Sequence, residues 1–367
     1  MSKFKVIQLL PELNIGGVER GTKDFSKVLV ERGHDSLVIS NGGIFEKDII
    51  EDGGKHIKLP IHKKSLFSIR YASDLRDIYL SEKPDIVHVR SRMPAWINYF
   101  AYKKLSHKPL LVSTFHGLYS TPLYSQVMSK VDHIIAISKT VEKYVLDNYP
   151  EHLKFAPRLI YRGSDEAYFS KNYQPQDAYI DNFFDQFPKL TNKKILSFPG
   201  RLSSWKGQES FIKLISELPE EFAGLIVGPY QNAKKKYLKN LKTLIQNYRL
   251  GDRVFFYDAK DDIRDIYYLS TIVFNLSSKP EPFGRTTLEA AMMGKKICGW
   301  DRGGAGEVLD MCYPDGKVEF GDFRQLTEKV KELTNSDKSP DNIFLTADLM
   351  HSKTVEFYLD ALDNKVR

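Results

Sequence analysis

The sequence predicts an α/β protein of two Rossmann-like, doubly wound domains that face each other across a cleft. At 367 residues the chain is too long for one ordinary domain of about 100–200 residues. Short apolar runs of strand length alternate with helical periodicities, which is the pattern of a parallel sheet covered by helices. The alternation breaks once, near residue 170, and then resumes. We therefore expect domains at residues 1–168 and 169–345, followed by a C-terminal helix at residues 346–367.

The first half consists of repeated strand–helix units. A Gly-Gly pair follows the first apolar run, and the helical spacing of Phe25, Val28 and Leu29 ends at Gly33, where a helix C-cap is expected. The elements expected here are strands at Lys5–Leu10, Ser36–Ser40, Asp85–Val89, Leu110–Thr114 and His133–Ile137, a helix at Glu19–Arg32, and further helical segments between the later strands.

The second half repeats the pattern after residues 171–192. That stretch is rich in Asn, Asp, Gln and Phe, contains two prolines, and is expected to be an irregular connector. The strands expected after it are Ile195–Pro199, Gly224–Val227, Val254–Tyr257, Ile272–Asn275 and Lys296–Gly299, and the helices are Gln208–Leu218, Lys235–Asn247, Thr286–Met293 and Thr346–Leu362. The sequence does not indicate which domain the last helix packs on.

Composition excludes several classes of protein. The chain is 42% hydrophobic and 28% charged, and no apolar run approaches the roughly 18–20 residues that span a bilayer. Cys298 and Cys312 form neither a disulfide framework nor a metal cluster, which is compatible with a reducing cytoplasm. The net charge of +7 arises in residues 1–165, with 25 Lys and Arg against 18 Asp and Glu. This excess is modest, and an ordinary solvated surface is the simpler explanation for it. A basic surface also suits phosphorylated ligands or anionic lipid, and we expect no nucleic-acid partner.

The segment Glu281–Gly294, E-P-F-G-R-T-T-L-E-A-A-M-M-G, carries the strongest chemical pattern. A predicted strand is followed by a loop and then by a helix whose first backbone N–H groups suit a diphosphate. Gly284 permits close approach of the backbone to a ligand. Glu281 before the helix and Glu289 about two turns inside it are placed to hold the two ends of one extended ligand. A capping carboxylate and a solvated helix glutamate are the simpler alternative.

A second pattern, Phe198–Gly207 (F-P-G-R-L-S-S-W-K-G), follows the first strand of the second half. Arg201 and Lys206 lie in the loop beyond this strand, where open α/β sheets bind ligands. Two cations there are suited to neutralise a diphosphate leaving group, the role a metal ion plays elsewhere. Taken alone, they also fit ordinary surface charges. The chain has no Asp-x-Asp pair, so no metal site is predicted.

Two weaker patterns lie in the first half. Asn14–Thr22, N-I-G-G-V-E-R-G-T, is a glycine-containing turn between a strand and a helix, but it is not G-x-G-x-x-G. His116 in T-F-H-G follows a strand, where a histidine is more often a structural hydrogen-bonding residue. Because the glycines after the first strand do not form G-x-G-x-x-G, a dinucleotide-dependent oxidoreductase is disfavoured.

Together these patterns resemble the family 4 glycosyltransferases, which have the GT-B fold. The order and spacing of the Gly-Gly loop, T-F-H-G, I-A-I-S-K at Ile135–Lys139, G-R-L-x-x-x-K-G and the glutamates eight residues apart match that family over nearly the whole chain. The resemblance assigns Arg201, Lys206, Glu281 and His116 to catalysis and assigns Gly16, Gly17, Phe283, Gly284, Arg285 and Glu289 to donor binding.

The resemblance also implies what each residue does. Arg201 and Lys206 would grip the departing diphosphate, and Glu281 would hold hydroxyls of the transferred sugar, with His116 nearby. Glu289 would bind the ribose. The family's last helix crosses back to the first domain, which suits residues 346–367.

Three arginines set this chain apart within that pattern. Val87–Trp96 carries Arg90 and Arg92 where many relatives have a histidine, and Tyr161–Asp165 carries Arg162 where an asparagine is commoner. Both segments resemble a bacterial subset that builds lipopolysaccharide or other cell-envelope polysaccharide. We expect these guanidiniums to suit an anionic acceptor.

The resulting expectation is a retaining, metal-independent hexosyltransferase that uses a UDP- or GDP-sugar and a glycan or lipid-linked acceptor, without a cofactor. A sugar-nucleotide epimerase of the same fold and a non-catalytic nucleotide-sugar-binding protein remain as alternatives. We expect a cytoplasmic protein, with peripheral contact to the inner face of the membrane as a further hypothesis. It rests on the mixed basic and apolar stretches His62–Phe67 and Tyr99–Leu105, which also fit an ordinary loop and helix face.

Overall fold

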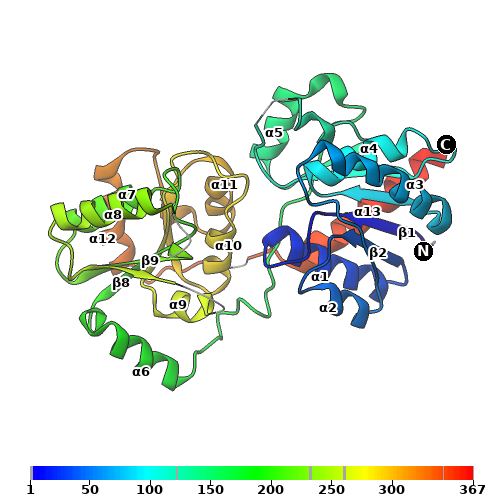
Figure 1. The fold of residues 1–367 in the computed structure, drawn as a ribbon. Coiled ribbons are helices and arrows are strands. Elements are labelled where there is room, and N and C mark those ends of the chain that lie inside the picture. Colours follow the sequence, from blue (N-terminus) through cyan, green and yellow to red (C-terminus); the bar gives the residue numbers. More distant parts are fainter. Residues whose placement is uncertain (1–2, 121–122, 231–233, 259–261, 342, 367) are drawn as a thin grey trace. The chain divides into compact units, whose positions relative to one another are not determined.

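The chain folds into two compact units, seen in a computed structural model that describes residues 3–120, 123–230, 234–258, 262–341 and 343–366. Unit 1 comprises Met1–Tyr161 together with Asp348–Arg367, and unit 2 comprises Arg162–Ala347 (Figure 1). The chain therefore leaves unit 1 and later returns to it.

Unit 1 is built on a parallel sheet with the strand order β3-β2-β1-β4-β5-β6-β7 in the part of the chain described. Its strands are β1 (Lys5–Leu9), β2 (Asp35–Ser40), β3 (Lys55–Lys58), β4 (Ile86–Val89), β5 (Leu110–Phe115), β6 (His133–Ala136) and β7 (Arg158–Leu159). Its helices are α1 (Gly17–Glu31), α2 (Glu46–Glu51), α3 (Tyr71–Glu82), α4 (Arg92–Tyr102), α5 (Lys139–Asn148) and α13 (Ala347–Val366), with 3-10 turns η1 (Leu66–Arg70), η2 (Gln126–Met128) and η3 (Pro150–His152).

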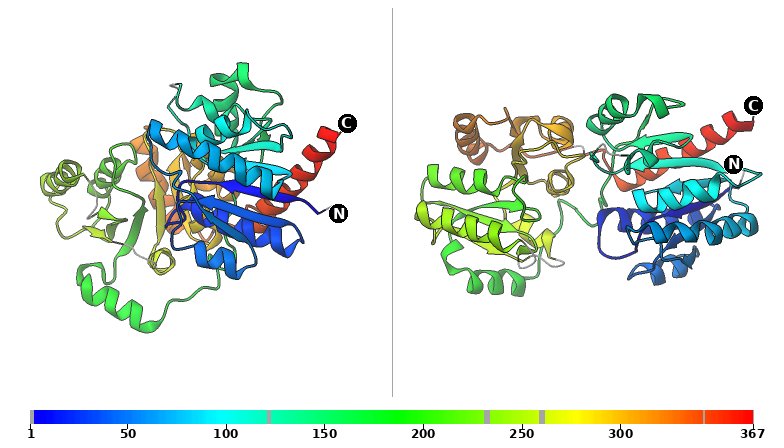
Figure 2. Two further views of the ribbon diagram at one scale, coloured as in Figure 1. Left: turned by 45° about the vertical axis from the view of Figure 1, so that its right-hand side comes forward. Right: turned by 45° about the horizontal axis from the view of Figure 1, so that its top comes forward.

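Helix α13 completes the core of unit 1. Its residues Val355, Tyr358 and Ala361 are buried in one cluster with Phe25 of α1 and with residues of β1, β4, β5 and β6. Figure 2 shows α13 running along the sheet of unit 1, so both ends of the chain lie in this unit. Helices on both faces bury the central strands β1, β4 and β5, which are therefore largely apolar along their length, whereas the edge strand β3 is exposed at both ends.

Unit 2 repeats the architecture with the strand order β10-β9-β8-β11-β12-β13 over its described residues. Its strands are β8 (Lys194–Pro199), β9 (Phe222–Val227), β10 (Val254–Tyr257), β11 (Ile272–Asn275), β12 (Lys296–Trp300) and β13 (Lys317–Val318). Its helices are α6 (Asp177–Gln186), α7 (Gln208–Glu217), α8 (Lys235–Asn247), α9 (Ile263–Leu269), α10 (Arg285–Met292), α11 (Gly303–Cys312) and α12 (Phe323–Asn335), with 3-10 turns η4 (Pro188–Leu190) and η6 (Pro314–Gly316). Every strand predicted from the sequence is present, with ends within two residues of the predicted ones.

The expectation of an irregular connector at residues 171–192 was wrong. Residues Asp177–Gln186 form α6, whose Phe183 packs in the core of unit 2 with Phe187 and Leu190 from the turn that follows. Tyr179, Phe183 and Phe187 recur every fourth residue, so they share one face of a helix. The polar residues between them cover the solvent side and made the segment look like a loop.

No helix among the described residues is both long enough and apolar enough to cross a membrane.

Candidate functional site

The predicted site residues of unit 2 meet at the carboxyl edge of its sheet. Arg201 and Lys206 follow β8, and Glu281 follows β11. These strands are neighbours in the sheet although about 75 residues separate them in the sequence. Parallel pairing therefore brings the two loops side by side.

Lys206 and Glu281 form an ion pair at the centre of this edge. The Lys206 ammonium donates to Glu281 Oε1 at 2.8 Å, and their side chains are only 18% and 11% exposed. The Ser277 hydroxyl donates to the same oxygen. The ammonium also lies 4.7 Å from the centre of the Trp205 ring, so it is held from two sides. Shielded from water, such a pair keeps one geometry.

The loop that presents Lys206 depends on Gly207. This residue has φ of 97° and precedes the first turn of α7. A Cβ atom there would lie 2.0 Å from the backbone oxygen of Leu276, so no other residue fits. The Ser278 N–H donates to the Trp205 carbonyl at 2.8 Å and ties the same loop to the end of β11.

Glu289 is a second buried carboxylate, located on α10. It is 5% exposed; its Oε1 accepts from Arg285 at 2.8 Å and its Oε2 accepts from the Tyr267 hydroxyl at 3.2 Å. Burial, and then the nearby carboxylate, raise the pKa of Tyr267 well above its usual value, so the phenol stays a donor. Glu289 lies a little over one turn into the helix, closer to its start than the two turns expected. Neither Tyr267 nor Ser277 was predicted from the sequence.

Phe283 and Gly284 lead into α10, but their side-chain positions face the protein. Phe283 is 3% exposed, so any contact it makes with a ligand is through its backbone. A Cβ atom on Gly284 would lie 2.7 Å from the Cα of Ala305 on α11. Close packing of α10 against α11 is therefore one reason for a glycine at position 284. The approach of a ligand to the backbone, predicted from the sequence, is a second and separate reason. Arg201, by contrast, is exposed at the start of its loop.

In unit 1 the predicted residues also follow adjacent strands. Gly16 precedes and Gly17 begins α1 after β1, Arg90 follows β4, and His116 follows β5. Since β1, β4 and β5 are consecutive in the sheet, these residues share its carboxyl edge. Gly16 has extended backbone, and its carbonyl accepts the Arg20 N–H at 3.0 Å to begin the helix.

The three arginines predicted to face an acceptor differ in their surroundings. Arg90 is only 8% exposed, donates through Nε to Gln8 at 2.9 Å, and lies over the Phe25 ring. Burial lowers its pKa to about 10, so it stays charged at neutral pH. Arg92 donates to the Ser125 hydroxyl at 3.1 Å and lies between the rings of Tyr119 and Tyr124.

Arg162 lies in the segment between β7 and α6. It belongs to unit 2, at the first residue of that unit. Arg90 directly follows β4 and Arg92 begins α4, whereas Arg162 lies on the segment that leaves unit 1.

A buried histidine lies directly beneath Arg90. His88 of β4 is hydrogen-bonded through Nδ1 to the Tyr358 hydroxyl of α13 at 2.5 Å and through Nε2 to the Thr114 hydroxyl at 2.7 Å. Burial, Arg90 and His116 lower the pKa of His88 well below 6.5. A neutral imidazole thus joins three elements under the carboxyl edge.

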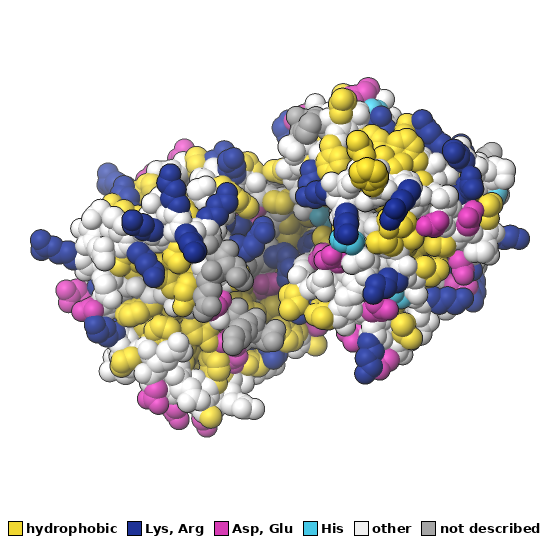
Figure 3. Space-filling model, in the orientation of Figure 1, with side chains coloured by type: hydrophobic (Ala, Val, Ile, Leu, Met, Phe, Trp, Pro, Cys, Tyr) yellow, Lys and Arg dark blue, Asp and Glu magenta, His cyan; other side chains and the backbone are white. Residues whose placement is uncertain are grey.

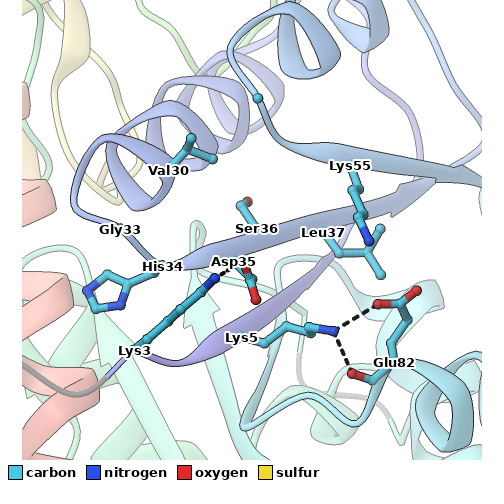
Figure 4. Close-up of a pocket in the computed structure, with 11 residues that line it drawn as sticks. Lys3, Lys5, Val30, Gly33, His34, Asp35, Ser36, Leu37, Lys55 and Glu82 are labelled. Atoms are coloured by element: carbon cyan, nitrogen blue, oxygen red, sulfur yellow. Dashed lines mark hydrogen bonds and ion pairs between the residues drawn. The ribbon is translucent and has the colours of Figure 1, made fainter.

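A separate cavity of about 300 Å³ lies at the opposite, amino edge of the same sheet (Figure 4). Four of its charged groups form two ion pairs, Lys3 with Asp35 at 2.9 Å and Lys5 with Glu82 at 3.0 Å. Open α/β sheets bind their ligands at the carboxyl edge, so this cavity is not the candidate site. Over the described residues, no three His, Cys, Asp or Glu side chains are grouped to hold a metal ion.

The chemistry available at the carboxyl edge of unit 2 is that of polar recognition. Lys206 has three N–H donors and gives one to Glu281. Glu281 Oε2 and the second lone pairs of both Glu289 oxygens are available, within the described residues, to accept from hydroxyl groups. Cations and carboxylates side by side suit a ligand that carries both phosphates and sugar hydroxyls.

Comparison with known proteins places these features in a family. Residues 15–167 match the profile described as Glycosyltransferase Family 4, and residues 180–345 match that described as Glycosyl transferases group 1. The chain is 24% identical over 273 residues to YtcC of Bacillus subtilis, a protein named as a glycosyltransferase. That match covers 71% of this chain but 64% of YtcC, which is less than two thirds of its length.

Two solved structures share the whole architecture. A glycosyltransferase from Rickettsia africae is 28% identical, with a TM-score of 0.81 over 99% of this chain and 100% of that one. Alr3699/HepE of Anabaena, solved in complex with UDP and glucose, is 19% identical, with a TM-score of 0.74 over 97% of this chain and 100% of that one; this likeness concerns the fold. With its two parallel sheets and its matches along both halves, the chain belongs to the family 4 glycosyltransferases and has the GT-B fold.

Proposed function

We propose that this enzyme is a retaining, metal-independent hexosyltransferase that uses a UDP- or GDP-sugar. The observation that carries the proposal is the Lys206–Glu281 pair, together with the buried Glu289 on α10, the helix that follows the Glu281 loop. The pair supplies a cation for the diphosphate and acceptors for sugar hydroxyls at the carboxyl edge of one sheet. The UDP and glucose bound by Anabaena Alr3699/HepE, which has the same fold, support a nucleotide-sugar donor.

In the proposed complex each side chain has a separate task. The two N–H groups of Lys206 that are not directed at Glu281 bind the diphosphate, and exposed Arg201 adds a second cation. Glu281 accepts from hydroxyls of the transferred sugar. Glu289, oriented by Arg285 and Tyr267, accepts from the ribose hydroxyls.

Gly16 and Gly17 complete the proposed donor site from unit 1. The first turn of α1 presents backbone N–H groups to the diphosphate there, and the Glu19 carboxylate, which lies against Gly16 in the structure, turns away as the ligand approaches. The backbone amides of Phe283 and Gly284 act in the same way at the first turn of α10.

The step we propose replaces the bond between the anomeric carbon and the diphosphate oxygen by one to the acceptor oxygen, on the same face of the sugar. The acceptor proton passes to the departing phosphate. Both proposed donor carboxylates are engaged in binding, so neither serves as a nucleophile. Catalysis then comes from positioning and from stabilising negative charge on the diphosphate by Lys206 and Arg201, the task that a divalent ion would otherwise perform.

The acceptor we propose is a glycan or a lipid-linked glycan of lipopolysaccharide or another cell-envelope polysaccharide, met at the inner face of the cytoplasmic membrane. His116 at the end of β5 is proposed to lie near the transferred sugar. Arg92 and, through the connecting segment, Arg162 are proposed to contact an anionic group of the acceptor. Since Arg90 is held by Gln8, we propose that it acts mainly by fixing this edge.

A thermal-shift screen of UDP-, GDP-, ADP- and CMP-sugars, with and without EDTA, tests the donor. We expect one nucleotide diphosphate sugar to raise the melting temperature equally with and without EDTA. Glu289→Ala should abolish the shift, whereas Glu328→Ala, at an exposed position on α12, should retain it. A shift that EDTA removes would contradict metal independence, and no response to any donor would contradict the proposed function.

A further inference from the structure

A hydrophobic surface on unit 1 is formed by two segments that are separate in the sequence. Leu66 and Phe67 protrude from η1 with exposed fractions of 84% and 83%, and Phe100 is exposed on α4. Beside them, a cavity of about 370 Å³ is lined by Leu66, Ile69, Trp96 and Phe100 among others. We call Leu66, Phe67, Trp96 and Phe100 the apolar patch. Figure 3 shows hydrophobic side chains gathered over α4 with Lys and Arg around them.

The patch is ordered by aromatic packing. Trp96 and Phe100 stack with ring centres 6.1 Å apart, and Tyr99 meets both rings at their edges. The Trp96 Nε1 donates to the Tyr124 carbonyl at 2.8 Å, so the indole presents only its apolar surface. A core of this kind would be buried in most proteins; here it borders an open cavity.

Four lysines lie close to the patch. Lys63 and Lys64 precede η1 and are exposed, Lys103 lies 4.4 Å from the Tyr99 ring, and Lys130 lies 5.7 Å from it. We call these four lysines the basic rim. The sequence segments that supply patch and rim, residues 53–73 and 86–131, contain eleven Lys and Arg and no Asp or Glu. Much of the positive excess of the chain therefore lies in these two segments.

We propose that the apolar patch and its basic rim dock this enzyme on an anionic lipid bilayer. Leu66 and Phe67 enter the acyl region, one acyl chain occupies the cavity beside Trp96, and the rim lysines contact lipid phosphates. Two protruding apolar residues next to a pair of lysines match an interfacial anchor. Exposed lysines next to exposed apolar side chains fit a bilayer of anionic lipid, which offers phosphates at the level of the lysines and acyl chains beneath them.

The inference rests on the proposed function in one respect, that the acceptor is carried at a membrane. Docking is therefore measured without donor or acceptor, and donor binding is measured without vesicles. Failure of one measurement leaves the other intact, so the two proposals are distinguished.

The test is flotation of the full chain with vesicles of phosphatidylcholine and with vesicles of phosphatidylcholine and phosphatidylglycerol in equal parts. We expect binding to the anionic vesicles, weakened by salt, and little binding to neutral ones. Leu66→Ser combined with Phe67→Ser should reduce the partition constant more than ten-fold. Lys63→Glu combined with Lys64→Glu should reduce it at least as much, because each lysine contributes about five-fold and the reversal adds repulsion.

Matched controls separate the patch from general surface effects. Ile50→Ser with Leu80→Ser changes two exposed apolar residues elsewhere in unit 1, and Lys235→Glu with Lys236→Glu changes two exposed lysines of unit 2. Both should float like the unmodified protein. If the serine pair does not fold, the Lys63/Lys64 reversal carries the same test, since both side chains are exposed.

Two results would overturn the proposal. One is equal flotation of the unmodified chain and both patch variants, or no flotation of any of them with anionic vesicles. The other is a dimer of the full chain, detected by light scattering, that becomes a monomer in the patch variants. That result would make the surface a contact between copies of the chain.

Discussion

Lys206 is placed so that its removal changes both stability and catalysis. Replacing it by alanine deletes the cation proposed for the diphosphate and leaves Glu281 with Ser277 alone. We expect Lys206→Ala to lower turnover of the donor found in the thermal screen by about 10²–10³-fold, as for loss of one preorganised donor. Steady-state kinetics with that donor would measure it.

The matched control is Lys236→Ala, at an exposed position on α8. It should keep the turnover of the unmodified enzyme. If Lys206→Ala also keeps it, Lys206 does not stabilise the leaving group.

Glu281 and Glu289 are expected to differ in what their loss affects. Glu289 is assigned to the ribose. Glu289→Gln should therefore lower the affinity for the free nucleoside diphosphate by about 10–100-fold, which is the effect of losing hydrogen bonds to a charged group. Glu281 is assigned to the sugar, so Glu281→Gln should lower turnover while the affinity for the free diphosphate stays unchanged. Calorimetric titration of each variant distinguishes these outcomes, and identical effects on the diphosphate would refute the division.

At the scale of single residues, sequence reasoning located the charged groups but not their partners. A pattern such as G-R-L-x-x-x-K-G shows which residues stand beyond a strand. It does not show that Lys206 meets a glutamate from a loop 75 positions away. Tyr267 was missed because a tyrosine inside an apolar helix reads as core; its hydroxyl on Glu289 is a consequence of tertiary packing. Arg90 was predicted to suit an anionic acceptor, and the sequence did not show that its side chain is buried against Gln8 and Phe25.

Among the loops and helices, the entry to α7 depends most on one backbone conformation. Gly207→Ala would force a side chain into positive φ and against the Leu276 carbonyl. We expect it to lower the free energy of unfolding by at least about 2 kcal/mol and to displace Lys206 next to it. Chemical denaturation would measure the change.

Gly251→Ala is the natural comparison. No atom lies within 4 Å of the position of its added Cβ. The free energy of unfolding should therefore change by no more than about 0.5 kcal/mol. Equal stability of the two variants would show that the loop relaxes around Gly207.

The contact between β4 and α13 predicts how unit 1 responds to acid. Burial lowers the pKa of His88 below the value near 6.5 that an unfolded histidine has. Between the two values the unfolded chain binds the extra proton, so the free energy of unfolding should fall as the pH drops below about 6.5. Burial also lowers the pKa of His34, His56 and His133, which adds to the slope.

Denaturation of the unmodified protein and of His88→Gln between pH 5 and 8 would test this. The variant is expected to be less stable at neutral pH, because the bonds to Tyr358 and Thr114 change, and to have the flatter pH dependence. A steeper profile in the variant would contradict a neutral His88.

Among whole elements, strands were the most predictable and amphipathic helices of mixed composition the least. Buried strands of a parallel sheet are continuous apolar runs, and the structure has them where the sequence does. Helix α6 was missed because Asn, Asp and Gln outweighed the fourfold spacing of its aromatic residues. Helix α12 was not singled out either, although Leu326, Val330 and Leu333 lie on its buried face. The destination of α13 is a tertiary contact that spacing alone does not encode.

For the molecule as a whole, two separate cores predict two unfolding events. Each unit has its own sheet and its own buried cluster. Because the proposed donor residues lie mainly on unit 2, binding of the nucleoside diphosphate should raise the melting temperature of the unit 2 transition. Ending the chain after Leu345 should remove the unit 1 transition, because Val355 and Tyr358 leave its core. Differential scanning calorimetry resolves both effects, and a retained unit 1 transition would contradict the role given to α13.

The return of the chain to unit 1 determines which unit can complete its core first during translation. All strands of unit 1 leave the ribosome first, but the helix that covers Phe25 and its neighbours is translated last, after the whole of unit 2. Unit 2 is thus the first to have its complete core, while the nascent sheet of unit 1 waits with apolar surface exposed. A nascent chain in that state is the species that a chaperone would bind. Slow translation between β7 and α13 would therefore lower the yield of native enzyme without altering any residue of its site.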